Sequence, residues 1–271
     1  MLIHAPAYLP VLPPEPFLGR GALLEQLNQT LAPERAVQLS GATGHGSHAL
    51  AAIIAQRYLT IGGKVLWATE GTPDDWLVAL RAGYQAPESD LATLLAQHAP
   101  LIVLDGIPAA VAAPFVSVQL AGRAPLIHLT PQREAGPWAN LTVPPLDQAA
   151  STALLQAVAP SITTEEATAL AEKLGGNPIW LRFAGAQIAS GATSAGQLLA
   201  LLAAVSASTE HLAKRLATEA FRPLERREQG LLTVFRASFT RRPRLRLSAA
   251  LLGQSLGSLP NEPLHCVAPW W

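Results

Sequence analysis

The sequence predicts an α/β fold, in which a parallel sheet is flanked by helices, followed by an all-helical region. Predicted strands alternate with predicted helices between residues 36 and 143, which is the order expected of a parallel sheet. The segment 101–105 has four consecutive large apolar residues and then an acid, as expected of a strand buried on both faces. After Pro145 only the helical spacing of apolar residues remains.

Each element follows from a local pattern. Residues 1–16 contain five prolines and are expected to form an extended arm, because proline fixes φ and donates no backbone hydrogen bond. Apolar residues at helical spacing predict a first helix over 21–31. The predicted strands are 36–40, 64–68, 101–105, 125–130 and 141–143. The remaining predicted helices are 49–59, 74–82, 89–97, 147–158, 163–174, 179–188, 197–205, 212–220 and 224–237.

These elements divide the chain into five segments. The segments are the arm (1–16), an α/β domain (17–145), a helical subdomain (146–210), the start of a further helical domain (211–240) and an irregular basic tail (241–271). In the tail and the helix before it, residues 214–246 contain ten Lys or Arg and three acidic residues. We interpret residues from about 241 as the product of a truncation, such as a reading-frame shift; a nucleic-acid-binding tail is the alternative.

Composition excludes several classes of protein. Hydrophobic residues make up 49% of the 271 and charged residues 14%, which is too apolar for a disordered chain. The 19 basic residues balance the 19 acidic ones, so neither nucleic acid nor a membrane surface is an expected partner. The single cysteine, Cys266, excludes an intramolecular disulfide framework and fits a cytoplasmic protein. No signal peptide or membrane-spanning run of apolar residues is present.

A glycine-rich turn joins the first predicted strand to the helix that follows. Its sequence over 41–48, GATGHGSH, has the glycine spacing of the phosphate-binding motif G-x4-G-K-[ST]. Backbone N–H groups at such a turn, together with the helix N-terminus, form an anion site. The candidate phosphate contacts are Gly41, Thr43, Gly44, His45, Gly46, Ser47 and His48.

Two side chains of that motif are replaced. Ser47 stands at the lysine position and cannot supply a fixed positive charge to the phosphates. His48 stands at the Ser/Thr position and is a poor ligand for Mg²⁺. We therefore expect weakened binding of ADP or ATP, with or without Mg²⁺, and no fast hydrolysis. The alternative is that residues 41–46 are only a tight connection between strand and helix.

Read together, the motifs resemble those of the STAND class of P-loop ATPases, the NB-ARC-like signalling switches. Phe17-Leu18-Gly19-Arg20 is similar to the entry motif of that family, which lies near the adenine. The strand 101–105 resembles the Walker B strand, whose acid, here Asp105, acts through Mg²⁺. The family usually has a second acid next, where this chain has Gly106. The resemblance covers residues 15–237 and implies a P-loop NTPase-type sheet.

Two further motifs extend the resemblance. The segment 126–133 resembles the sensor strand, which implies that Arg133 lies near the γ-phosphate. The segment 174–181 resembles the Gly-x-Pro motif, which implies that Pro178 lies against the base. The start of a winged-helix domain is implied at 224–239. Each residue also has a structural interpretation: Asp105 as a turn residue, Arg133 as a surface residue, and Pro178 as the first residue of a helix.

Four functions remain open from the sequence. They are a nucleotide-binding switch with little turnover, a pseudo-NTPase scaffold that binds no nucleotide, a working ATPase with non-standard residues, and a DNA-associated regulator. The first is the preferred hypothesis for the role of the fold, with nucleotide as ligand and protein partners that the sequence does not identify. The second is preferred for the chemistry, and little separates the two. The fold by itself does not establish any of them.

Overall fold

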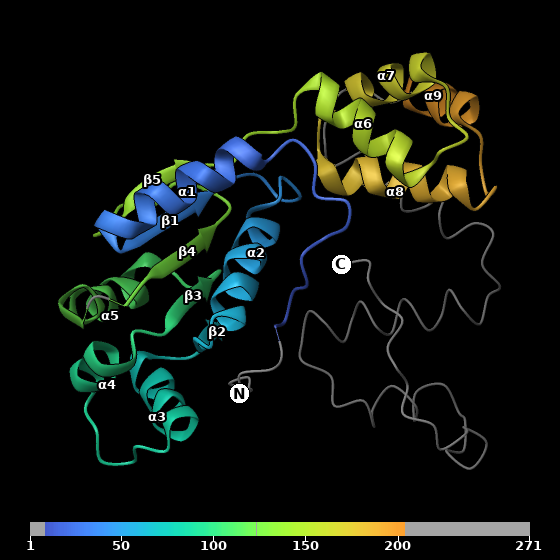
Figure 1. Cartoon of the computed structure of the whole chain (residues 1–271). Coiled ribbons are helices and arrows are strands. Elements are labelled where there is room, and N and C mark those ends of the chain that lie inside the picture. Colours follow the sequence, from blue (N-terminus) through green and yellow to red (C-terminus); the bar gives the residue numbers. More distant parts are fainter. Residues whose placement is uncertain (1–8, 123, 204–271) are drawn as a thin grey trace, which may run out of the picture. The chain divides into compact units, whose positions relative to one another are not determined.

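The computed structural model of the chain describes residues 9–122 and 124–203, and Figure 1 shows their helices and strands. The described residues up to Ala200 belong to one compact unit. The strands are β1 (Ala36–Ser40), β2 (Val65–Ala68), β3 (Leu101–Asp105), β4 (Leu126–Thr130) and β5 (Ala139–Thr142). The helices are α1 (Gly21–Glu34), α2 (Ser47–Thr60), α3 (Pro73–Tyr84), α4 (Leu91–His98), α5 (Ala109–Gly122), α6 (Gln148–Val158), α7 (Thr164–Lys173), α8 (Pro178–Ala189) and α9 (Ala195–Ala203).

The five strands form one parallel sheet in the order β2-β3-β4-β1-β5. Strand β4 therefore lies between β1 and β3, although it follows both in the sequence. Ser40 at the end of β1 pairs with Thr130 at the end of β4, and Asp105 at the end of β3 pairs with Leu129. Three carboxyl ends thus meet at one edge of the sheet, and the predicted parallel sheet is confirmed.

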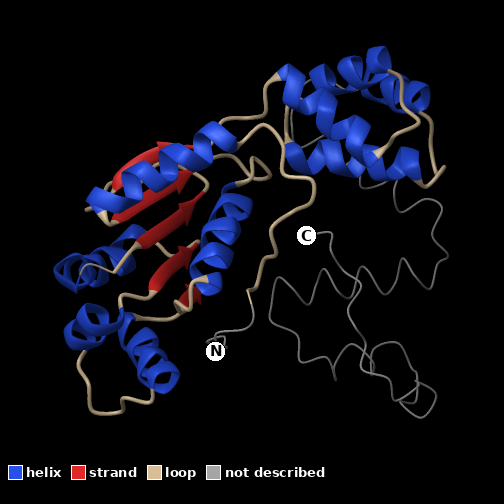
Figure 2. Cartoon of the chain, in the orientation of Figure 1, coloured by secondary structure: helices blue, strands red, loops and turns tan. Residues whose placement is uncertain are grey.

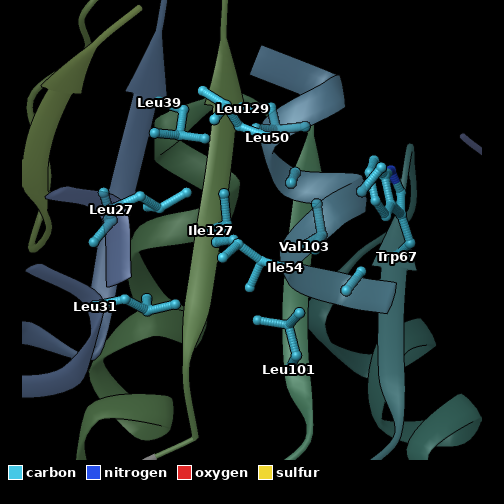
Figure 3. Packing of buried hydrophobic residues seen from close by; sticks show 14 of the residues in the cluster. Leu27, Leu31, Leu39, Leu50, Ile54, Trp67, Leu101, Val103, Ile127 and Leu129 are labelled. Carbon is cyan, nitrogen blue, oxygen red and sulfur yellow. The ribbon is translucent and has the colours of Figure 1, made fainter. Parts of the chain in front are cut away.

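Helices cover both faces of this sheet (Figure 2). On one face, apolar residues of α1 and α2 pack against alternate residues of the strands, and Figure 3 shows Leu27, Leu50 and Ile54 among them. On the other face, α3, α4 and α5 supply a second core that contains Trp76 and Phe115. Side chains alternate between the faces of a strand, so a strand buried on both faces must be apolar throughout. This requirement explains the run Leu101–Leu104.

Helix α5 is missing from the elements that the sequence predicts. Its residues carry no polar stripe, and Pro114 lies inside it. Proline usually ends or kinks a helix because it lacks an N–H donor. The helix forms because Ala112, Phe115 and Val116 are buried against the sheet and against α4, so tertiary packing outweighs the local preference.

Between residues 146 and 203 the structure describes helices and no strand. Asp147 caps α6 by accepting a hydrogen bond from the Ala150 N–H at 2.7 Å, as its position in the sequence predicts. Thr163 and Glu166 form a capping box at the start of α7. Helix α6 packs against α7 and α8, and the predicted helices in this range are confirmed to within a few residues.

A chain of buried polar groups ties the strands to the loops beyond them, and we call it the His128 chain. The Glu134 N–H donates to Gln38 Oε1 at 2.9 Å, and Gln38 Nε2 lies 3.3 Å from His128 Nδ1. His128 Nε2 lies 2.7 Å from the Ile107 carbonyl oxygen. Both ring nitrogens have partners when Nε2 carries the proton. Burial lowers the pKa of His128, so the ring stays neutral.

Several predicted segments lie outside the described residues. They are residues 1–8 of the proline-rich arm, and everything after residue 203, including the helices 212–220 and 224–237, the winged-helix start and the basic tail. Of the helices that are described, none combines the length and the apolar character needed to cross a membrane.

Candidate functional site

The candidate site is built on the turn between β1 and α2. Gly44 and Gly46 have φ of +90° and +101°, a backbone conformation that residues with a side chain rarely adopt. The turn closes with a hydrogen bond from the His45 N–H to the Ala42 carbonyl at 3.0 Å. The glycine spacing in the sequence therefore corresponds to a real backbone requirement.

The start of α2 is open to an anion. Its N-cap is Gly46, and no side chain accepts a hydrogen bond at the cap. The first N–H groups of a helix have no intrahelical acceptor, and the helix dipole places partial positive charge there. A Cβ added to Gly46 would meet no atom within 4 Å, so the space on that side of the N-cap residue is open.

The back of the turn is held by Arg20 and His45. Arg20 is only 6% exposed, and its Nη2 donates to the carbonyls of His45 at 2.9 Å and Pro144 at 2.6 Å. His45 Nδ1 lies 3.2 Å from the Val143 carbonyl oxygen. Burial lowers the pKa of the Arg20 guanidinium. These bonds fix the turn relative to the segment that follows β5.

A second support comes from the start of α8. Asn177 caps that helix through the Ile179 N–H, and its Nδ2 donates to the Thr43 carbonyl at 3.0 Å. A Cβ at Gly44 would lie 2.5 Å from Asn177 Oδ1, so the turn and the start of α8 are closely packed. Pro178 follows as the first residue of α8 and is half-buried. Residues 134 positions apart thus meet at the glycine turn.

The first turn of α2 also contacts the end of β3. His48 Nε2 lies 2.9 Å from Asp105 Oδ1, with the His48 side chain 56% exposed and the Asp105 side chain 18% exposed. The indole N–H of Trp67 donates to the other oxygen, Asp105 Oδ2, at 3.1 Å. The hydrogen bond to the carboxylate raises the pKa of His48 above its usual value. Both oxygens of this carboxylate are therefore engaged by nitrogen donors.

A nucleotide phosphate fits these residues. In the described part of the chain, three buried side-chain polar atoms have no partner: Gln119 Oε1 on α5, and Arg20 Nε and Thr130 Oγ1, whose residues bond the turn. Arg20 bonds the turn directly, and the Thr130 carbonyl accepts the Gly41 N–H where the turn begins. Buried polar groups without partners are rare and costly, so a ligand that reaches them gains binding free energy.

Magnesium does not fit them. Mg²⁺ requires octahedral oxygen ligands and, in a phosphate loop, a Ser or Thr hydroxyl at the position of His48. Position 48 is an imidazole with no oxygen to offer, and it bonds one oxygen of Asp105 directly. Among residues 9–122 and 124–203, no cluster of three or more His, Cys, Asp or Glu could hold a metal ion.

The predicted site residues divide into two groups. The structure joins the turn residues, Arg20, His48 and Asp105 through the contacts above, and Pro178 follows Asn177, which bonds the turn. Ser47, at the lysine position, is buried. Arg133 lies in the loop after β4 with its side chain exposed, and none of the contacts found in the described part of the chain links it to the turn. Gly106 has φ of +68° and no side chain that could act as a second acid.

Sequence reasoning missed two contributors, Trp67 and Asn177. Trp67 belongs to the core, as the sequence suggests, but its N–H also holds Asp105. Knowledge that β2 pairs with β3 would have pointed to it, since Trp67 pairs with Val103, two residues before Asp105 and on the same face. Asn177 precedes a proline at a helix start, and that local pattern predicts a cap without predicting its second bond.

Among the comparisons with known proteins, only the one with solved structures found a similarity. No protein family matches the chain by its sequence pattern, and no curated protein matches it in sequence. A Signal Transduction ATPase with Numerous Domains (STAND) that has a tetratricopeptide-repeat sensor, from Pyrococcus horikoshii, matches 92% of the chain with a TM-score of 0.52 and 17% identity. The chain spans 40% of the length of that protein.

A Walker-type ATPase of Pyrococcus abyssi matches 95% of the chain and 90% of its own length, with a TM-score of 0.54 and 13% identity. At such identities the likeness concerns the fold. This chain combines three features: the strand order of the sheet, the glycine turn between β1 and α2, and the acid at the end of β3. The fold of the chain is therefore similar to that of these two ATPases, with a parallel sheet and a glycine turn after its first strand.

Proposed function

We propose that the chain is the nucleotide-binding module of an NB-ARC-like signalling switch, which holds ADP or ATP with impaired hydrolysis. The observation that carries the proposal is the open start of α2 behind two glycines of positive φ. Backbone amides at a helix N-terminus bind phosphate without help from a lysine side chain. The unpartnered Arg20 Nε and Thr130 Oγ1 are further polar atoms that a ligand could satisfy.

Three positions support the proposal of impaired hydrolysis. Ser47 offers a buried neutral hydroxyl where the motif has a lysine, Gly106 offers no second acid, and Asp105 is engaged by His48 and Trp67. The loss of one electrostatic contact to a transition state costs about 3–4 kcal/mol of barrier. Loss of several such groups therefore leaves binding as the proposed role.

The remaining expectations belong to this proposal. Arg20 and Pro178 are proposed to lie near the adenine, and Arg133 would reach the γ-phosphate only if its loop moved. A cytoplasmic location and protein partners that carry the signal are part of the same hypothesis. The DNA-associated alternative depends on basic residues 214–246, which lie outside the described residues.

A scaffold that binds no nucleotide is the second candidate, and Asn177 favours it. Its side chain bonds Thr43 and packs against Gly44, so the turn is supported from within the chain. A turn that needs no ligand to keep its shape can persist after binding is lost. The two candidates differ in one property, which is whether ADP stabilises the folded chain.

Thermal unfolding of the full chain with and without ADP tests the proposal. A ligand that binds only the folded state stabilises it by about 2.7 kcal/mol at one hundred times its Kd. We expect ADP to raise Tm and adenosine, which lacks phosphate, to raise it much less. The double variant Ser47→Lys with His48→Thr should increase the ADP shift, whereas Ser117→Lys, on an exposed position of α5, should not.

The absence of any effect of ADP on Tm would contradict the proposal. If millimolar ADP leaves Tm unchanged in both the natural chain and the double variant, nucleotide binding is contradicted and the scaffold is favoured. A double variant that responds while the natural chain does not would mean that the pocket is sound and that the two replacements abolished binding.

A further inference from the structure

The contacts of Asp105 indicate whether a nucleotide would bind this site with Mg²⁺ or without it. In a phosphate loop with its full motif, Mg²⁺ bridges the phosphates, a hydroxyl at the start of the helix and, through water, an acid on the neighbouring strand. That arrangement needs an oxygen ligand at the start of the helix and a carboxylate that is free to accept hydrogen bonds from the water on the ion. The residue type at position 48 and the partners of Asp105 are therefore informative.

In this chain those two positions touch. His48 Nε2 is 2.9 Å from Asp105 Oδ1, which is the length of a direct charge-assisted hydrogen bond. Mg²⁺ prefers oxygen ligands, and an imidazole supplies none. Position 48 therefore offers no ligand to the ion, and its ring engages one oxygen of the acid.

The bond is supported on its far side by Trp67. The indole is part of the buried core, 4% exposed, and its Nε1 donates to Asp105 Oδ2 at 3.1 Å. With one donor on each oxygen, the carboxylate is held in one orientation. A metal ion would have to displace His48, and it would gain no hydroxyl ligand at that position in return.

We propose that this site binds its nucleoside diphosphate without a divalent cation, because His48 supplies no oxygen ligand and both oxygens of Asp105 are engaged by His48 and Trp67. The inference rests on the proposed function and specifies its ligand: the metal-free nucleotide in place of the magnesium complex. Phosphate contacts then come from the backbone amides of the turn and α2, and not from a bound ion. Free ADP and Mg-ADP are separate species in solution, so the two forms can be tested against each other.

Calorimetric titration of the full chain with ADP provides the test, once in EDTA and once in excess Mg²⁺. We expect the Kd in EDTA to be equal to, or tighter than, the Kd in Mg²⁺. In His48→Thr, which frees Asp105 and supplies a hydroxyl, Mg²⁺ should tighten ADP binding by about tenfold. The matched control is His98→Thr at the end of α4, where the ring stacks on Tyr84; it should behave like the natural chain.

Each outcome is decisive. Tighter binding in Mg²⁺ than in EDTA by tenfold or more, in the natural chain, overturns the inference and leaves the proposed function standing. No ADP binding in either buffer contradicts the proposed function, and the inference falls with it. If His48→Thr folds by circular dichroism and binds ADP but gains no magnesium dependence, then His48 does not determine the form of the ligand.

Discussion

Two histidines of this fold, His48 and His128, occupy opposite kinds of environment. His128 is fully buried in β4 and bonds an amide and a carbonyl, and its pKa is lowered by burial. His48 lies at the edge of the sheet with more than half of its side chain exposed, and its bond to a carboxylate raises its pKa. Burial thus lowers the pKa of the ring in the core, and the hydrogen bond to a carboxylate raises the pKa of the ring at the candidate site.

The two histidines therefore have different roles: His128 supports the fold, and His48 belongs to the candidate site. The His128 chain joins β1, β4 and the two loops that follow β3 and β4, so it fixes the strand ends on which the site is built. The His48–Asp105 bond joins only the first turn of α2 to the end of β3. Changes to the first should therefore act on stability, and changes to the second on ligand binding.

The largest expected effect is that of Gln38→Leu. The substitution leaves His128 Nδ1 and the Glu134 N–H without partners, and buried unsatisfied groups cost about 1–3 kcal/mol each. We expect the free energy of unfolding to fall by about 2–4 kcal/mol in urea titrations. Gln29→Leu, on the exposed side of α1, is the matched control and should change it by less than about 0.5 kcal/mol. Equal losses in the two variants would contradict the role of the His128 chain.

The change in the free energy of unfolding with pH should be smaller than the effect of Gln38→Leu. It should have two limbs, a decline at lower pH and a decline at higher pH. Because the folded-state pKa of His128 is lowered, its contribution is complete above the unfolded pKa of about 6.5 and is lost as pH falls below that value. Because the pKa of His48 is raised, its contribution is complete below about 6.5 and is lost as pH rises through the higher folded value.

Urea unfolding between pH 5 and 8 checks these limbs. We expect His48→Gln to remove the decline at higher pH and to leave the decline at lower pH. A higher-pH limb that survives in His48→Gln would mean that another group causes it.

The smallest expected effect is the coupling free energy between His48 and Asp105. The pair is largely solvent-exposed on the histidine side, and exposed ion pairs are worth about 0–1 kcal/mol. A double-mutant cycle with His48→Ala and Asp105→Ala should give a coupling within that range. A coupling above about 2 kcal/mol would show that this bond also supports the fold, and the comparison between the two histidines would fail.

Local patterns in the sequence were enough to predict the elements that carry the site. The boundaries of β1 and β3 agree with the predicted strands, because each strand ends at a polar residue that is followed by a glycine. The opening of α2 follows from the glycine spacing. Helix α5 escaped prediction because it is apolar all round and contains Pro114, so its helical form depends on packing.

Contacts between residues far apart in the sequence could not be predicted, for a different reason. The order of strands in a sheet is not contained in any local pattern, so the bonds of Asp105 to Trp67 and His48 could not be read from the sequence. The same holds for Asn177 and Thr43, which are 134 positions apart. The sequence identified His48 as a poor ligand for Mg²⁺, and only the structure shows which group it bonds in place of the ion.

Hydrogen exchange at the backbone amides of the glycine turn tests the central claim most directly. The account predicts that ADP slows exchange in the segment 41–50, because the open amides of the turn and of the first turn of α2 would bond phosphate oxygens. Adenosine should leave that segment unchanged. Protection by ADP that is confined to other segments, with 41–50 exchanging at its original rate, would contradict the claim that this turn cradles phosphate.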